Sequence, residues 1–540
     1  MDLEFLTLLT RANDAQVSAL LTDYRDQSDS ARAVARKARR LAAGFVSDRS
    51  AYHRDGALLE SLGWLMAELV ARQHPDGLYD VGNLHSPPDT AFVIQDVCMV
   101  YALLGGTPSL GEVIRRAGPA LAAGGVHTPN HRWEVSAALA RVNALFPDPQ
   151  YVARIDEWLA EGIDATPDGI YSERSSTYAA EVTNPSLLTL ARLQDRPDLL
   201  AYVRRNLEAT LYLLEPNGEV DTIASRRQDQ KSMRDVWWYL MQFRELALLD
   251  GDGRFAAVAR AIETRGVGEL GDFLADILEQ PALAAALPAG SAPTDFVHHF
   301  PSQASVRIRH DSRTATVFGG TDNLGVIASG LSTNPTFFKA RTGNAILDSV
   351  RLSPQFFGTG HFRSKGLQVL GSNTYRLFDE SRVPYHLPLP PQLRRTNGQY
   401  ELGWDGRFYS AMDFSDRPRE YRTLRTEVTI VEVARGFDLS FEFSGDETVY
   451  AIELCFRPGG VLTGADTLDA SGNYQLTSGT GSYAVGTDRI EFGPGSGPLR
   501  VAMDPGEVYT YLGADLVPDG VRVYLTGRTP RRQMLQLRLS

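Results

Sequence analysis

The side chains best suited to chemistry gather first in one short run, 128–134. There, an amide, an imidazole, a guanidinium and an indole stand side by side as Asn130, His131, Arg132 and Trp133. Pro129 disfavours helix for the residue before it, and Asn is a good N-cap, so we expect Asn130 to cap a helix. Apolar residues then recur at helical spacing. The run is therefore predicted to lie at the mouth of a helix.

A second polar run, 171–178, follows a turn signal at 166–169 and precedes a helix expected near Asn184. It contains Glu173, Arg174 and Tyr178. A tyrosine can give or take a proton when neighbouring cations lower its pKa from about 10, and arginines are available in both runs. Two polar, aromatic-rich loops at the same ends of neighbouring helical hairpins are typical of an active-site rim in a helical toroid.

Several other positions are candidates for binding a substrate. His85 lies in a polar loop before an apolar helix, and the segment 221–230 is dense in planar hydrogen-bonding groups. Arginine suits an anionic sugar because its guanidinium binds a carboxylate in a bidentate manner. The candidate substrate-binding residues are His85, Arg132, Trp133, Glu173, Arg174, Arg226, Arg227, Gln228, Lys339, Arg341 and His361. Several of them also have a structural interpretation: Glu173 and Arg174 as an exposed ion pair, His85 as a turn residue, and Arg226 and Arg227 as part of a polar network with Asp221 and Asp229.

Composition limits the function classes. The chain has 540 residues, which is more than one hydrophobic core usually covers, and its net charge of -12 argues against a nucleic-acid or anionic-membrane partner. A small basic pocket on an acidic surface remains compatible with an anionic substrate, and a homo-oligomer is compatible with these features. The two cysteines lie far apart in apolar runs, which predicts buried free thiols. The metal and cofactor motifs considered do not occur, so no cofactor and no catalytic metal are expected.

The N-terminus is acidic from Asp2 onward and has no basic region followed by an apolar core. No stretch of 18 or more apolar residues occurs either. These features predict a cytoplasmic protein.

The hydrophobic period changes along the chain and predicts two domains. Amphipathic helical segments separated by Gly, Pro, Asp and Asn run from about 31 to 278. A segment rich in Pro, Ala, Gly and Ser, 281–294, is predicted to be a linker. Short alternating strands with frequent turns follow it. We therefore expect stacked helical hairpins over 1–285, either a solenoid or an α/α toroid (an incomplete barrel of helical hairpins), and an antiparallel β-sandwich over 295–540.

This order of domains, together with both polar runs, resembles the heparinase II/III-like polysaccharide lyases, a group that includes the oligoalginate lyases. Asn130-His131 resembles the family's Asn-His pair, and 168–178 resembles its loop that leads to a catalytic tyrosine. The sequence departs from the family at Ala179, where many members have a histidine. For the histidine that many members bring from the β-domain, His361 is a candidate, while His299 and His310 are weaker ones.

The resemblance implies a carbon–oxygen lyase that acts on 4-linked uronic-acid glycans. Such an enzyme removes the C5 proton of the uronate and expels the 4-linked sugar, which leaves an unsaturated product. By this analogy Asn130 would neutralise the uronate carboxylate, an oxyanion-hole effect. His131 would be the base or a second neutralising group, and Tyr178 would be the acid, or both acid and base.

Two other functions stay open at this point. A glycoside hydrolase on an α/α toroid would need two carboxylates across the scissile bond. The acidic residues available in the expected rim loops are Asp80, Asp89, Glu134, Glu173, Asp221 and Asp229. A non-catalytic carbohydrate-binding protein would use the cleft only for recognition. The product distinguishes them, since only a lyase creates a conjugated double bond that absorbs in the near ultraviolet.

Overall fold

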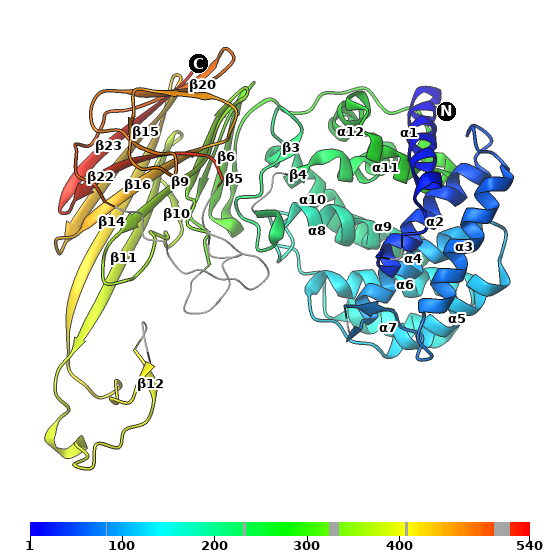
Figure 1. Ribbon diagram of the computed structural model, residues 1–540, viewed down its shortest axis with the longest axis horizontal. Coiled ribbons are helices and arrows are strands. Elements are labelled where there is room, and N and C mark those ends of the chain that lie inside the picture. Colours follow the sequence, from blue (N-terminus) through cyan, green and yellow to red (C-terminus); the bar gives the residue numbers. More distant parts are fainter. Residues whose placement is uncertain (27, 83, 231–233, 323–333, 406–408, 502–518) are drawn as a thin grey trace. The chain divides into compact units, whose positions relative to one another are not determined.

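The structure is a computed structural model that describes residues 1–540 except 27, 83, 231–233, 323–333, 406–408 and 502–518 (Figure 1). Its contacts divide the chain into two units. The helical unit comprises Met1–Asp221 and Met233–Pro293, and the β unit comprises Thr222–Ser232 and Thr294–Ser540.

The helical unit is built from long helices joined by short turns and two-residue strands. Its α-helices are α1 (Leu3–Thr22), α2 (Ala31–Val46), α3 (Gly56–Arg72), α4 (Pro87–Leu103), α5 (Pro108–Ala123), α6 (Pro129–Leu145), α7 (Pro149–Ala160), α8 (Ser176–Tyr178), α9 (Asn184–Leu193), α10 (Leu200–Leu213), α11 (Leu240–Asp250), α12 (Gly253–Arg265) and α13 (Leu274–Glu279). A π-helical turn, η1 (Ala179–Thr183), and four 3-10 turns, η2 (Pro197–Leu199), η4 (Val236–Tyr239), η5 (Gly268–Phe273) and η6 (Pro281–Ala284), accompany them. The two-residue strands are β1 (Asp80–Val81), β2 (Leu84–His85), β3 (Glu219–Val220) and β4 (Arg234–Asp235).

Two neighbouring inner helices of this unit, α2 and α4, run in the same direction. Helix α2 packs on α4, α4 on α6 and α6 on α9, while α13 packs back on α2. Arg32 pairs with Asp89 at 2.9 Å, and seven residues later on both helices Arg39 pairs with Asp96, also at 2.9 Å. Pairs that advance together along α2 and α4 require parallel helices. Parallel neighbouring helices at α2 and α4, in a series that packs back on α2 through α13, agree with the α/α toroid that the sequence predicted.

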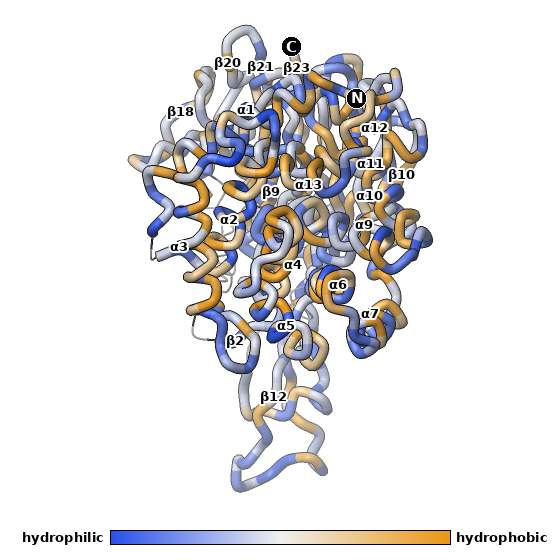
Figure 2. The backbone as a smooth tube through the Cα atoms, turned by 90° about the vertical axis from the view of Figure 1, so that its right-hand side faces the viewer, coloured by the Kyte–Doolittle hydropathy of each residue, from blue (hydrophilic) through white to orange (hydrophobic). Residues whose placement is uncertain are grey.

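Helix capping and burial explain why these segments fold as they do. Ser30 caps α2, and Ser86 caps α4, which begins with Pro87 at its first position. In Figure 2 hydrophobic and hydrophilic residues alternate along the turns of α2 and α3, as one apolar face per helix requires. Helix α4 is buried on nearly all sides, in agreement with its apolar sequence.

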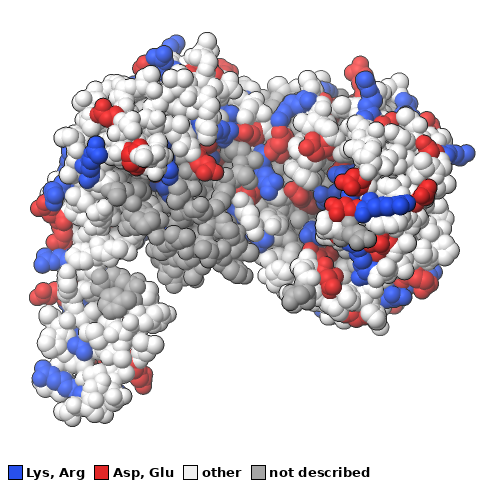
Figure 3. Space-filling model, in the orientation of Figure 1, with Lys and Arg blue, Asp and Glu red and all other residues white. Residues whose placement is uncertain are grey.

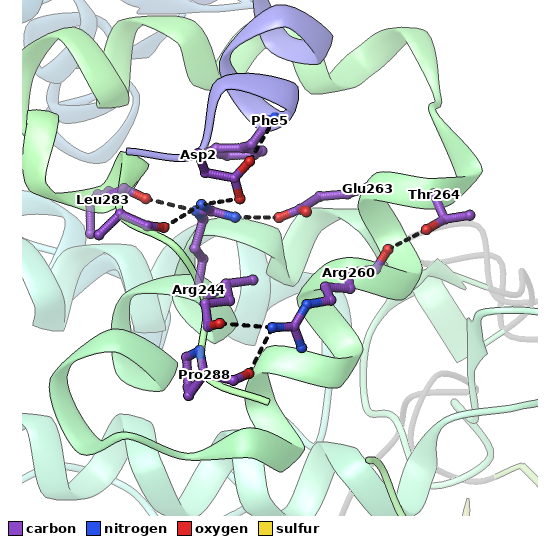
Figure 4. Close-up of polar contacts among 10 residues, drawn as sticks. Asp2, Phe5, Arg244, Arg260, Glu263, Thr264, Leu283 and Pro288 are labelled. Atoms are coloured by element: carbon purple, nitrogen blue, oxygen red, sulfur yellow. Dashed lines mark hydrogen bonds and ion pairs between the residues drawn. The ribbon is translucent and has the colours of Figure 1, made fainter. Parts of the chain in front are cut away.

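A fully buried arginine ties four parts of the helical unit together (Figure 4). The Arg244 guanidinium, from α11, bonds Glu263 of α12 at 2.5 Å and Asp2 before α1 at 3.0 Å. It also donates to the carbonyl oxygens of Leu283 and Ala285, each at 2.7 Å. Its carbon Cζ lies 3.6 Å from the centre of the Phe5 ring. This cluster closes the helical unit by joining its N-terminus to its last elements.

The β unit contains two large sheets. Its strands are β5 (Asp295–Phe300), β6 (Ser305–His310), β7 (Arg313–Phe318), β8 (Phe338–Thr342), β9 (Ala345–Pro354), β10 (Leu367–Val369), β11 (Thr374–His386), β12 (Gly403–Trp404), β13 (Tyr409–Ser410), β14 (Arg419–Val433), β15 (Gly436–Gly445), β16 (Val449–Phe456), β17 (Val461–Thr463), β18 (Asp466–Thr467), β19 (Asn473–Gln475), β20 (Gly481–Val485), β21 (Asp488–Gly493), β22 (Val521–Arg528) and β23 (Arg531–Leu539). The 3-10 turns η3 (Gln228–Gln230), η7 (Pro301–Gln303) and η8 (Pro391–Leu393) also belong to this unit.

One sheet has the order β10-β11-β14-β15-β23-β21-β20-β17, and the other has the order β18-β19-β22-β16-β9-β8-β7-β6-β5. Neighbouring strands are antiparallel, except that β19 pairs parallel with β22. Apolar side chains from both sheets form a single core, with Val350 and Ile452 from one sheet and Phe441 and Leu537 from the other. The unit is therefore the antiparallel β-sandwich that the sequence predicted.

Two details concern the region around the expected domain boundaries. Residues 281–284 form η6, and Leu283 and Ala284 are buried in the core of the helical unit, so the regular structure of that unit extends into the expected linker. The segment Thr222–Ser232 groups with the β unit although it lies between helices of the first unit in sequence.

Within the part of the chain that the structure describes, no helix is both long enough and apolar enough to cross a membrane. Figure 3 shows acidic and basic side chains interspersed on one face of the helical unit.

Candidate functional site

The first polar run lies at the start of α6, but Asn130 does not cap this helix. Helix α6 begins at Pro129, and Thr128 is its N-cap residue. The N-cap prediction for Asn130 was wrong because proline, with its fixed φ, is favoured at the first helical position, so the helix begins at Pro129 and its cap lies two residues before Asn130. Asn130 is therefore the second residue of the helix and is only 2% exposed.

A hydrogen bond joins the two polar runs that the sequence singled out. The amide Nδ2 of Asn130 donates to the carboxylate Oε2 of Glu173, and both side chains are buried. Because an amide nitrogen carries two N–H groups, this bond fixes the orientation of Asn130 and leaves a second donor on the same nitrogen. The pair therefore holds an amide in place at the mouth of α6.

His131 is half-buried beside Asn130. Its ring packs edge-on against Phe92, with ring centres 6.3 Å apart, and against His127, with ring centres 4.7 Å apart. The aromatic neighbours restrict the rotation of the imidazole at the start of the helix.

Tyr178 is half-buried and ends the short helix α8. Ser175 caps this helix, since its Oγ accepts a hydrogen bond of 3.1 Å from the backbone N–H of Tyr178. The hydroxyl of Tyr239 donates to the carbonyl oxygen of Ser176 at 3.0 Å. The chain then continues through the π-helical turn η1, which packs against α6, into α9. Such π turns inside helices are frequent at functional sites.

Buried amide side chains anchor the loop before Tyr178 through hydrogen bonds. Asn184 accepts a hydrogen bond of 2.7 Å from the hydroxyl of Tyr171, and its Nδ2 donates to Asn206 at 2.8 Å and to Gln242 at 3.1 Å. Asn206 in turn donates to the carbonyl oxygen of Gly169 at 3.0 Å. The loop is thus anchored to α9, α10 and α11, and Tyr171 has a structural role.

Two residues of the first run are engaged in the fold itself. Arg132 pairs with Glu161 at 2.8 Å and with Asp164 at 3.2 Å. Trp133 is fully buried and donates its indole N–H to Asp164 at 3.1 Å. Burial leaves no face of the Trp133 indole for a sugar, so we remove Trp133 from the candidate binding surface, together with the paired Arg132.

Arg174 is half-buried and has a left-handed backbone, with φ of 53°. His85 lies on the exposed strand β2, where its Nδ1 is 2.7 Å from the carboxylate of Asp76.

The remaining candidates lie in the β unit. Arg226 is bound in a bidentate manner by Asp322, at 2.7 and 2.6 Å, so a carboxylate of the chain itself already occupies its guanidinium. Arg227 is half-buried, and Gln228 is exposed at the start of η3. Lys339 and Arg341 lie on β8, where Arg341 is buried and donates to the carbonyl oxygen of Gly343 at 2.9 Å.

His361 is buried at 5% exposure. Among the residues that the structure describes, neither nitrogen of its ring has a hydrogen-bond partner. Burial, followed by the charges of Arg351 and Arg363, lowers the pKa of His361 to about 3. The imidazole is therefore neutral near pH 7.

A cavity of about 190 Å³ occupies the interior of the helical ring and is lined mainly by α2, α4, α6, α9, α11 and α13. Burial is the main cause that raises the pKa of Glu134 and of Glu245 to about 7, and the pKa of Asp276 to about 6. Glu134 accepts hydrogen bonds from Gln95 at 2.8 Å and from Ser186 at 3.2 Å. The cavity thus carries less negative charge near neutral pH than its sequence suggests.

This polar interior was not predicted from the sequence. Three arginines of α2 line it, Arg32, Arg36 and Arg39, and their spacing of four and three residues places them on one face of the helix. That spacing was the signal that could have identified the cavity.

Comparison with protein-family models gave no match, and comparison with curated proteins gave none either. Solved structures, in contrast, match over nearly the whole chain. A heparinase III structure superposes with a TM-score of 0.59 at 13% identity and covers 98% of this chain and 85% of the other. A Streptomyces coelicolor A3 chondroitin AC lyase in complex with chondroitin sulphate gives 0.54 at 12% identity and covers 99% and 79%.

A Paenibacillus xanthan lyase gives a TM-score of 0.58 at 10% identity and covers 98% of this chain, which spans only 57% of that longer protein. These similarities extend over both the helical and the β unit. The chain therefore has the fold of the α/α-toroid polysaccharide lyases, and the fold resemblance predicted from its sequence is confirmed.

Proposed function

We propose that the chain is a polysaccharide lyase that cleaves 4-linked uronic-acid glycans by β-elimination. The observation that carries this proposal is the hydrogen bond from Asn130 to Glu173, which fixes an amide donor at the mouth of an inner toroid helix. The fold shared with heparinase III and chondroitin AC lyase supports it independently.

In the proposed reaction Asn130 neutralises the carboxylate of the uronate. Its second amide N–H donates to a carboxylate oxygen, so negative charge that develops at C5 is delocalised towards a hydrogen-bonded oxygen. The N-terminus of α6 adds a favourable partial positive charge beside the same group. Both effects lower the barrier to removing the C5 proton.

Tyr178 is the proposed acid that protonates the departing 4-linked oxygen, and His131 is the proposed base or a second neutralising group. Both side chains are half-buried, which combines access for a sugar with restricted motion. If the C5 proton and the leaving oxygen lie on the same face of the sugar, Tyr178 performs both transfers. If they lie on opposite faces, two groups are required.

The test is absorbance in the near ultraviolet during incubation with alginate, glycosaminoglycan, gellan-type and glucuronan oligosaccharides. Wild type is compared with Asn130→Ala and Tyr178→Phe. We expect a rising signal on at least one substrate and its loss, by a factor of about 100 or more, in both variants. A rising signal that is indifferent to both changes would contradict the proposed site.

A glycoside hydrolase is the second candidate, and one observation favours it. Burial raises the pKa of the Glu134 carboxyl group to about 7. A carboxyl group with this pKa is partly protonated near neutral pH, as a general acid must be. New reducing ends that form without absorbance, and that disappear in Glu134→Gln, would support the hydrolase over the lyase.

A further inference from the structure

A second cluster of the helical unit consists of His74, Asp80 and His85, which lie in the segment between α3 and α4. The Nε2 atom of His74 lies 2.9 Å from Oδ2 of Asp80, and the Nε2 atom of His85 lies 3.6 Å from Oδ1 of the same carboxylate. The imidazole rings of His74 and His85 are stacked, with centres 4.0 Å apart. One ligand atom from each of the three residues lies within 4.8 Å of the other two.

The backbone holds these three side chains in fixed relation. Asp80 and His85 are directly opposite each other in the β1–β2 hairpin, so their side chains project from the same face. Tyr79, just before the hairpin, is buried and donates its hydroxyl to the carbonyl oxygen of Leu69 at 2.7 Å. Ser86, just after it, caps α4. Both ends of the hairpin are therefore anchored to helices.

A tight turn brings His74 to the hairpin directly after α3. The backbone N–H of Gly77 donates to the carbonyl oxygen of His74 at 2.9 Å, and that of His74 donates to the carbonyl oxygen of Leu78 at 3.0 Å. Gly77 has φ of +93°, and a Cβ there would lie 2.2 Å from the carbonyl oxygen of Arg116. Only glycine fits this turn, which places His74 beside Asp80.

A fourth residue, Asp76, orients one of the histidines. Its Oδ2 lies 2.7 Å from Nδ1 of His85, and its Oδ1 accepts a hydrogen bond of 3.0 Å from the backbone N–H of Leu78. A carboxylate is ionised near neutral pH and can only accept a hydrogen bond, so the short contact with Asp76 assigns the proton of His85 to Nδ1. The Nε2 lone pair of His85 then faces Asp80. A carboxylate behind a histidine is the usual support of a metal-ligating imidazole.

We propose that His74, Asp80 and His85 form a binding site for a divalent transition metal ion, with zinc as the best fit. Two imidazole nitrogens and one carboxylate oxygen suit zinc and disfavour magnesium and calcium, which take oxygen ligands. Tetrahedral zinc with bonds of 2.0–2.1 Å sets its donor atoms about 3.3 Å apart, close to the separations of 2.9 and 3.6 Å found here. Water completes the coordination, since all three side chains are 33–46% exposed.

The bound ion links the β1–β2 hairpin, through Asp80 and His85, to His74 just after α3. It therefore holds the chain entry into α4, whose residues Phe92 and Gln95 line the interior cavity. Because the ion binds the folded chain and not the unfolded chain, it stabilises the folded state by mass action.

The test uses the full chain without a histidine tag, stripped with a chelator and dialysed against Zn²⁺ or Co²⁺ at one equivalent. Bound metal is measured by mass spectrometry of the elements, and Co²⁺ is followed by its visible absorption. We expect one ion per chain. His74→Ala and His85→Ala should each lose the ion, and Asp76→Asn should weaken its binding by a factor of about 10–100.

His53→Ala is the matched control, because His53 is an exposed histidine of the same unit outside the cluster. It should retain the ion fully. Thermal unfolding of the metal-free variants checks that each is folded. Retention of less than one tenth of an ion by wild type would overturn the proposal and leave a His74–Asp80 ion pair alone. Equal retention by His74→Ala, His85→Ala and wild type would overturn it as well.

Discussion

At the scale of single residues, the proposed chemistry depends on how Asn130 is held. A free asparagine at a helix start would rotate between several hydrogen-bonding partners. When its orientation is fixed before the substrate binds, the entropy cost of ordering the side chain is not added to the reaction barrier. Glu173 provides this restraint from a loop more than forty residues further along the chain. Asn130 differs from an ordinary residue at a helix start because its side chain bonds Glu173, a residue of the second polar run.

Tyr178→Phe should remove the proton donor without disturbing the fold. We expect kcat on the responsive glycan to fall by a factor of about 100 to 10,000 with little change in KM, since the ring remains and only the transferable proton is lost. Steady-state kinetics measures both values. Tyr171→Phe is the matched control, because the Tyr171 hydroxyl bonds Asn184 inside the fold. It should cost about 1 kcal/mol of stability and leave kcat largely intact.

Glu134→Gln should change the pH dependence of stability. The pKa of Glu134 is raised to about 7 in the folded chain, above its ordinary value of 4.5, so the folded state binds its proton more tightly than the unfolded state. This stabilisation is complete below about pH 4.5 and is lost as the pH rises towards 7. The glutamine variant lacks this loss. Its stability relative to wild type should therefore rise by about 2–3 kcal/mol between pH 5 and pH 7.5.

Chemical denaturation at several pH values measures this difference. The hydrogen-bond pattern survives in the variant, since Gln95 can still donate to the amide oxygen and the Ser186 hydroxyl can accept from the amide nitrogen. A difference that stays constant with pH would show that Glu134 is ionised throughout this range.

At the scale of elements, the loop that carries Glu173 and Tyr178 depends on one tight turn. Gly169 has φ of +82°, and a Cβ at this position would lie 2.2 Å from the carbonyl oxygen of Arg205. Gly169→Ala should therefore destabilise the unit by about 2–4 kcal/mol and reduce activity, because the backbone must shift to avoid the overlap. Thermal unfolding and the near-ultraviolet assay measure the two effects.

Gly162→Ala separates the steric effect from the conformational one. Gly162 has the same φ of +82°, but no atom lies within 4 Å of a Cβ there. It should cost about 1 kcal/mol and leave activity unchanged. Equal effects of both substitutions would contradict the argument that contact with Arg205 positions the loop.

The sequence predicted the elements at the site better than their ends. The helix after Pro129 and the loop before Tyr178 follow from apolar spacing and turn residues. The predicted cap was two residues too late because both Thr128 and Asn130 are acceptable caps and only the proline geometry decides between them. The π turn after Tyr178 packs against α6, and no local sequence pattern records such a contact between distant segments.

At the scale of the whole molecule, the order of a helical and a β region was predictable because each has its own hydrophobic period. The pairing of Arg226 with Asp322 and of Arg132 with Asp164 was not, because each pair joins distant segments. A charged residue in a loop looks the same in sequence whether it faces a substrate or a partner in the fold. The interior cavity likewise exists only once the inner helices close into a ring.

The Arg244 cluster should dominate the stability of the helical unit. Arg244→Met leaves the Glu263 carboxylate and two carbonyl oxygens without their buried donor, which should cost about 3–5 kcal/mol. Chemical denaturation measures it. Arg254→Met is the control, because its guanidinium is 44% exposed and pairs with Glu208 and Asp252 at the surface. That loss should be below about 1 kcal/mol.

Mass spectrometry of the products from one defined uronic-acid oligosaccharide tests the central claim most directly. Elimination splits the substrate without adding water, so the masses of the two fragments should sum to the mass of the substrate, with the double bond on the fragment that carries the new non-reducing end. Asn130→Ala should abolish this pair of products. Fragments whose masses sum to the substrate plus one water would instead identify a hydrolase and contradict the proposed lyase.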